Sequence, residues 1–169
     1  MSKVKNEAKI KNPLIVGIRE QLEHRALWLY LLCDEAEKHG LEAENFAGDA
    51  VRRCGLFQGK GLTDKAKTQS LKGLKKTLFT LPARKVFEMK VKRCDDDRLD
   101  LDFGYCPLVK AWQKQGCSDE EIARLCDIAM CGDRAIAESF GCHLDLLKTI
   151  ANGDDCCALR FARNGKKPE

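Results

Sequence analysis

The spacing of apolar residues changes near the middle of the chain, and this change most constrains the fold. Between residues 87 and 103, apolar side chains alternate with charged ones, and aspartates at positions 95–97 interrupt the alternation. Alternation places apolar side chains on one face of a strand and charged side chains on the other. Consecutive aspartates are typical of a turn. The segment therefore predicts an antiparallel hairpin with one buried and one solvated face.

The residues before this hairpin have helical spacing instead. From residue 13 to residue 40, apolar side chains recur every three or four positions, which predicts a long amphipathic helix. Charged residues in its middle, including Arg25, are expected on its solvated face. Two further helices are predicted at 41–55 and 63–78, because the glycines at positions 55–61 are expected to loosen the chain between them.

Helical patterns return after the hairpin. A short helix is predicted from Cys106-Pro107 to residue 115. Ser118 and Glu121 then match a capping box, which predicts the start of another helix. Cys131-Gly132 is expected to interrupt this helix, and Asp133 is expected to cap its continuation.

The last part of the chain predicts a second hairpin, with strands near 143–150 and 157–161. The whole order of elements indicates an α+β fold, in which N-terminal helices pack on a small antiparallel sheet made of two hairpins. We expect a single domain over residues 13–163. Residues 1–12 are expected to form a flexible basic tail, and residues 164–169 a polar tail.

Composition excludes several classes of protein. With a net charge of +4 and 7% aromatic residues, the chain lacks the dense basic face with aromatics expected of a nucleic-acid-binding protein. No apolar run is long enough to span a membrane, and no signal-type segment follows the basic N-terminus. We therefore expect a cytoplasmic protein with a small-molecule partner. The first long helix offers a surface for a homodimer.

Six cysteines, joined by a seventh next to the last of them, lie in the C-terminal third, where most of the chemistry is expected. Cytoplasmic thiols stay reduced, so ten cysteines indicate catalysis, metal binding or burial rather than disulfides. Cys106 precedes a predicted helix, whose N-terminus is expected to lower the thiol pKa. Cys157 is expected on the inner face of the last strand. His143 is a candidate general base, and Asp133, Asp154 and Asp155 are candidate acid, base or orienting carboxylates. Asp154 is also a candidate substrate-binding residue.

A soft metal is a competing use of the same thiols. Cys106, Cys126 and Cys157 could hold zinc or an iron–sulfur cluster, with Cys131 or Asp133 completing the ligands. Otherwise no cofactor is expected. A third alternative is a small-molecule-binding sensor domain without catalysis, in which the cysteines fill the core.

The C-terminal residues also resemble a known family. The resemblance is carried by Cys106-Pro107, Trp112, Gly116, Glu121, Leu125-Cys126, Asp133, Ala137-Glu138, Phe140-Gly141 and the run from Gly153 to Phe161. Over about residues 100–163, these resemble L-2-amino-thiazoline-4-carboxylic acid hydrolases. The segment is also similar, more distantly, to small-molecule-binding domains of the four-vinyl-reductase type, which implies an enclosed ligand pocket between helices and sheet.

The resemblance to the hydrolases implies an activity and two site residues. The family opens a cyclic amidine ring to give a carbamoyl-cysteine, so the expected reaction is hydrolysis of a carbon–nitrogen bond in a small cyclic amidine or thiazoline carboxylate. Cys157 matches the cysteine of the family's closing motif and is implied to be the nucleophile, with Cys106 as the alternative. Arg160 matches the motif's arginine and is a candidate to bind the substrate carboxylate. Ala158 and Leu159 depart from the acidic and aromatic residues usual there.

Overall fold

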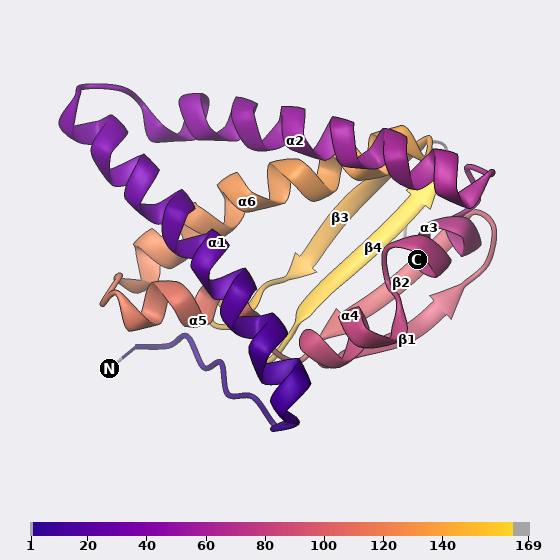
Figure 1. Cartoon of the computed structure of the whole chain (residues 1–169), viewed down its shortest axis with the longest axis horizontal. Coiled ribbons are helices and arrows are strands. Elements are labelled where there is room, and N and C mark those ends of the chain that lie inside the picture. Colours follow the sequence, from indigo (N-terminus) through magenta and orange to yellow (C-terminus); the bar gives the residue numbers. More distant parts are fainter. Residues whose placement is uncertain (1, 164–169) are drawn as a thin grey trace.

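The structure is a computed structural model, and it describes residues 2–163 (Figure 1). Helices and strands segregate along the chain, with four helices before the first hairpin and two between the hairpins. The helices are α1 (Pro13–Lys38), α2 (Ala43–Ala66), α3 (Leu71–Thr77), α4 (Leu81–Val86), α5 (Pro107–Lys114) and α6 (Asp119–Ser139); a short 3₁₀ helix, η1, spans Ile150–Asn152. The strands are β1 (Met89–Cys94), β2 (Arg98–Phe103), β3 (Cys142–Lys148) and β4 (Cys157–Arg163).

The four strands form one antiparallel sheet in the order β1-β2-β4-β3. The predicted α+β class and the two hairpins are confirmed. The first hairpin turns where the aspartates predicted a turn, because the Asp95 carboxylate accepts hydrogen bonds from the backbone N–H groups of Asp97 (3.0 Å) and Arg98 (2.8 Å). The second hairpin joins the first through the pairing of β2 with β4, which places Leu101 opposite Leu159.

One face of the sheet is apolar and helps to build the core. Leu99, Leu101 and Phe161 are at most 1% exposed. The ring of Phe79, which follows α3, lies 5.7 Å from that of Phe161, measured between centroids. The neighbouring residues of the same strands point to the other face, where Arg160 forms an ion pair with Asp102. The two faces therefore differ in polarity, as the alternation predicts.

The first helix has the predicted bounds. Asn12 caps it by accepting hydrogen bonds from the N–H groups of Leu14 and Ile15. Figure 1 shows α1 and α2 diverging from their shared turn, with α6 running beside α2. No helix within residues 2–163 is both long and apolar enough to cross a membrane.

The predicted break between the second and third helices is wrong. Residues 43–66 form the single helix α2, and only 71–77 form a separate short helix. The predicted interruption of α6 near Gly132 is also wrong, since the helix is continuous and Asp133 lies inside it. The glycines serve close packing between the two helices instead. A Cβ atom added at Gly55 would lie 2.2 Å from the carbonyl oxygen of Gly132.

This close approach predicts opposite effects of alanine at two glycines of α2. Gly55→Ala should lower the free energy of unfolding by about 1–3 kcal/mol, because backbone of α6 occupies the space its methyl group needs. Gly61→Ala is the matched control, since nothing lies within 4 Å of its Cβ position. It should raise stability by about 0.5–1 kcal/mol through helix propensity. Urea unfolding of both variants measures the difference, and equal effects would contradict the packing.

The segment before α1 is extended and packs along the domain. Val4 and Asn6 are each only 4% exposed. The Asn6 amide donates a hydrogen bond to the carbonyl oxygen of Cys106 (2.7 Å) and accepts one from the Cys106 N–H (2.9 Å). Part of the predicted tail thus pairs with the residue that precedes α5. The predicted polar tail at 164–169 lies outside the described residues.

Candidate functional site

Five ionisable side chains from four parts of the fold converge on one region. They are Arg25 of α1, Cys106 at the N-cap of α5, Cys126 and Asp133 of α6, and Cys157 of β4; together we name them the thiol–carboxylate cluster. Asp133 and Arg25 both influence the pKa of Cys106, and Cys106 influences those of Cys126 and Cys157. Cys126 and Asp133 share a face of α6 because they are two helical turns apart.

Asp133 has the most unusual environment of the cluster. Burial raises the pKa of its carboxyl to about 6, although Arg25 and Arg134 oppose the rise. The side chain is nevertheless partly exposed, and it forms no hydrogen bond or ion pair with any of residues 2–163. A carboxyl group of this kind exchanges its proton near neutral pH, as acid–base catalysis requires.

The thiols of the cluster are held in their neutral form. Burial raises the pKa of Cys106, so the predicted lowering by the helix N-terminus is wrong in its net direction. The helix does contribute in the predicted sense, since backbone hydrogen bonds from Leu108 and Val109 oppose the rise. Burial likewise raises the pKa of Cys126 to about 12, and that of Cys157 still further above its ordinary value. Desolvation outweighs the helix terminus at Cys106, and it is the largest cause of the raised pKa at all three sulfurs.

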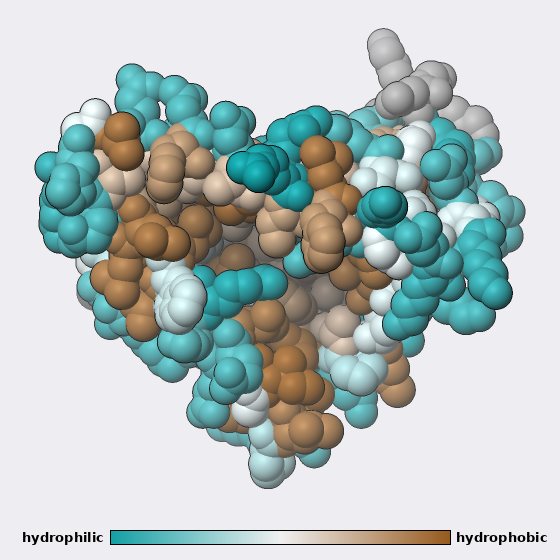
Figure 2. Space-filling model, turned by 45° about the horizontal axis from the view of Figure 1, so that its top comes forward, coloured by the Kyte–Doolittle hydropathy of each residue, from teal (hydrophilic) through white to brown (hydrophobic). Residues whose placement is uncertain are grey.

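The cluster thiols differ in access. Cys106 and Cys126 are partly exposed, whereas Cys157 is 8% exposed and its sulfur accepts the Ile150 N–H at 3.3 Å. Figure 2 shows that one face of the molecule is hollowed, with many apolar side chains around the hollow.

Comparison with known proteins identifies the family. A family model described as L-2-amino-thiazoline-4-carboxylic acid hydrolase matches residues 19–161. The chain belongs to this family. The match extends well beyond residues 100–163, which carried the resemblance in the sequence, and it includes every member of the thiol–carboxylate cluster. No curated protein and no solved structure matches the chain.

Three other candidate residues of this hydrolase-family chain lie apart from the cluster. His143 and Arg160 lie on the opposite face of the sheet from Cys157, as the pairing of His143 with Ala162 indicates. Arg160 is bound there by Asp102 (2.9 Å) and by the carbonyl oxygen of Leu101 (2.9 Å). His143 lies 3.2 Å from the Asp145 carboxylate.

The third of these residues, Asp154, has a local role in the turn before β4. Its carboxylate accepts the N–H of Thr149 at 2.8 Å and closes the turn that contains Gly153, whose φ of 91° suits glycine. These contacts place Asp154 in the second hairpin and leave Asp133 as the carboxylate of the cluster.

The metal alternative lacks support from the geometry. Within residues 2–163, no three or more His, Cys, Asp or Glu side chains are arranged to hold a metal ion. Cys106, Cys126 and Cys157 are near enough to affect one another's pKa, yet they do not form such a set. These three thiols therefore lie close together without being arranged as metal ligands.

Arg25 is the cluster member that sequence reasoning missed. Mid-helix charges are most often solvated, and Arg25 is indeed exposed. What distinguishes Arg25 is that its charge affects the pKa of both Asp133 and Cys106, which are more than 80 positions away in the chain. No local pattern contains that information.

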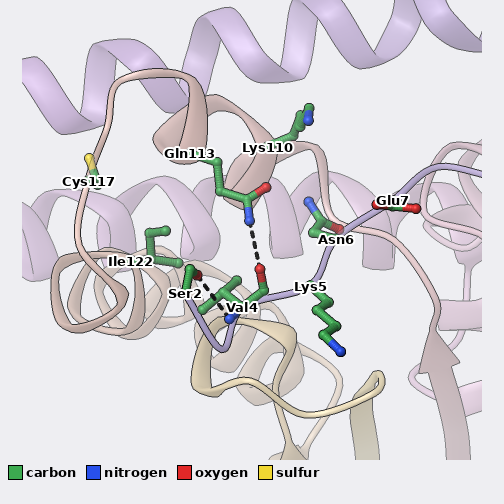
Figure 3. A pocket seen from close by; sticks show the side chains of 9 residues that line it. All are labelled: Ser2, Val4, Lys5, Asn6, Glu7, Lys110, Gln113, Cys117 and Ile122. Atoms are coloured by element: carbon green, nitrogen blue, oxygen red, sulfur yellow. Dashed lines mark hydrogen bonds between the residues drawn. The ribbon is translucent and has the colours of Figure 1, made fainter.

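A separate depression of about 780 Å³ lies between the N-terminal segment and helices α5 and α6. Figure 3 shows Ser2, Val4 and Gln113 around it, with the Gln113 amide donating to the Val4 carbonyl oxygen (2.9 Å). It is open to solvent, and it contains none of the cluster residues. Its size alone does not make it the site of chemistry, and the cluster remains the better candidate.

Proposed function

We propose that the thiol–carboxylate cluster is the active site of a thiol-dependent hydrolase that opens a small cyclic amidine or thiazoline carboxylate. The family description supports the substrate class. The observation that carries the proposal is Asp133, a carboxyl with a pKa of about 6 that is partly exposed and unpaired, and that interacts electrostatically with Arg25 and with the thiols of Cys106 and Cys126. Carboxyl groups with such raised pKa values gather at catalytic sites.

Arg25 is suited to hold the substrate carboxylate. It affects the pKa of Asp133, yet the two side chains form no ion pair with each other or with any other of residues 2–163. Its guanidinium is therefore available to an anionic group of the substrate. A guanidinium binds a carboxylate through two parallel hydrogen bonds, which would fix the orientation of the ring.

Cys106 is the better-placed nucleophile, and Asp133 is the group that moves its proton. Because burial keeps the thiol neutral, its proton passes to the Asp133 carboxylate as the sulfur adds to the amidine carbon. The ring carbon–nitrogen bond then breaks, and Asp133 returns the proton to the departing nitrogen. Water next attacks the same carbon and releases the Cys106 thiol, leaving a carbamoyl product.

The direct experiment is incubation of the purified chain with L-2-amino-thiazoline-4-carboxylate. Mass spectrometry should detect a carbamoyl-cysteine, formed with consumption of one water per molecule of substrate. The D-enantiomer is the control for chance reaction with free thiols. Absence of product, or equal rates with both enantiomers, would refute the proposed activity.

Asp133→Asn tests the carboxyl group. It should lower kcat by about 10²–10⁴-fold, because asparagine cannot take the proton. The wild-type rate should rise with pH through about 6, where Asp133 ionises. The pH dependence of stability should have the opposite sign. Because the folded-state pKa of Asp133 lies above the ordinary value of 3.8, the free energy of unfolding of the wild type should fall as pH rises from about 4 to 6. Asp133→Asn should remove that fall.

Glu120→Gln is the matched control, since Glu120 lies on the same helix but is exposed and forms no ion pair with any of residues 2–163. It should change neither the rate nor its pH dependence. Chemical unfolding at pH 5 and pH 7 measures the stability effect independently of activity. A wild-type pH profile identical to that of Asp133→Asn would remove Asp133 from the mechanism.

A further inference from the structure

A second pocket, of about 370 Å³, lies between α3, α4 and the end of β1, on elements that do not contribute to the thiol–carboxylate cluster. Four basic side chains line it: Lys72, Lys75, Lys76 and Arg84. Only Lys72 has an acidic partner among residues 2–163, with its ammonium 3.0 Å from the Asp96 carboxylate. The remaining three positive charges are not balanced by ion pairs.

Arg84 is the most informative of the four. Its Nε atom is buried and has no hydrogen-bond partner among residues 2–163. The guanidinium as a whole forms no hydrogen bond or ion pair with any of residues 2–163. A buried donor without a partner is unfavourable, because it has lost its hydrogen bonds to water. An anion in the pocket would satisfy it.

A neutral donor completes the lining. Thr80 is the N-cap residue of α4, but its side chain makes no capping hydrogen bond, so its hydroxyl is available to a ligand. Three unbalanced cations with a hydroxyl suit a compact, multiply charged oxyanion better than a single carboxylate. We propose that this pocket binds phosphate, either as the free ion or as the phosphate group of a small metabolite. The site is additional to the proposed hydrolase activity and does not depend on it.

Isothermal titration with inorganic phosphate, at constant ionic strength, tests the proposal. Saturable binding with a Kd of about 1 mM or below is expected. Arg84→Gln should weaken it by about tenfold or more, because it removes charge-assisted hydrogen bonds. Lys75→Gln should also weaken it, and this variant guards against a folding defect of Arg84→Gln. Lys60→Gln is the control, since Lys60 is an exposed residue of α2 outside the pocket.

Cys94 provides an independent readout, because it is the thiol that lines this pocket. Burial raises the pKa of Cys94, and Lys75 and Lys72 oppose that rise, so a bound anion should raise the pKa further as well as block access to the thiol. Phosphate should therefore slow modification of Cys94 by iodoacetamide, measured by peptide mass spectrometry, and leave exposed Cys54 unchanged.

Comparing the affinities of two ligands distinguishes the possible sources of the anion. A small phosphate ester that binds more tightly than inorganic phosphate would assign the pocket to a metabolite, whereas equal affinity would assign it to the free ion. No saturation by phosphate, equal binding of chloride, or an unchanged affinity in both Arg84→Gln and Lys75→Gln would overturn the proposal.

Discussion

Replacing Cys106 with alanine is expected to lower kcat by about a thousandfold or more, because it removes the sulfur that adds to the substrate in the proposed reaction. The fold should tolerate the change, since Asn6 bonds to the backbone of Cys106 rather than to its thiol. Circular dichroism and the urea midpoint check the fold, and product formation from L-2-amino-thiazoline-4-carboxylate measures the rate.

Comparison with two other cysteines makes this prediction specific. Cys54→Ala is the surface control, because Cys54 is exposed on α2, and it should keep full activity. Cys157→Ala should reduce activity less than Cys106→Ala, since Cys157 is deeper and its sulfur already accepts the Ile150 N–H. If Cys157→Ala instead abolishes turnover while Cys106→Ala retains it, the nucleophile is the cysteine of the closing motif.

The largest effect on stability is expected for Arg19→Met, which should lower the free energy of unfolding by about 3–5 kcal/mol. Arg19 is 3% exposed. Its guanidinium donates to the carbonyl oxygens of Val86 (2.8 Å) and Ile10 (2.6 Å), forms an ion pair with Glu88 (3.1 Å), and lies over the Tyr105 ring. Methionine fills similar space but leaves the Glu88 carboxylate, whose side chain is only 10% exposed, without its cation.

An exposed arginine provides the control for this loss. Arg52 pairs with Glu138 at 2.6 Å, but both side chains are about half exposed. Arg52→Met should change stability by less than about 1 kcal/mol, because solvent screens surface ion pairs. Guanidinium chloride unfolding of both variants measures the contrast, and similar losses would show that burial is not what strengthens the Arg19 pair.

Local pattern was enough to predict most elements of this fold. The alternation between residues 87 and 103 predicted the first hairpin, and Ser118 with Glu121 predicted the start of α6. The helix breaks near Gly55 and Gly132 were wrong for a shared reason. Glycine is locally a weak helix former, but here each glycine faces the other helix: an added Cβ would lie 2.2 Å from the Gly132 carbonyl oxygen at Gly55, and 3.2 Å from the Val51 side chain at Gly132.

The candidate site was less predictable than the fold. Cys106, Asp133 and Cys157 were proposed from residue type and position, and Cys106 interacts electrostatically with each of the other two. His143 and Arg160, proposed on the same grounds, lie on the far face of the sheet. The alternation of β4 already predicted that Arg160 and Cys157 point in opposite directions, whereas nothing local indicated Arg25.

The sequence by itself determined most of the helices, the two hairpins, the polarity of each sheet face and the family to which the chain belongs. These depend on residues that are neighbours along the chain, so their spacing carries the information. Only the tertiary structure decided which ionisable groups meet and in which protonation state. The pKa of Asp133 near 6 and the neutral thiol of Cys106 result from loss of solvent and from charges on distant segments.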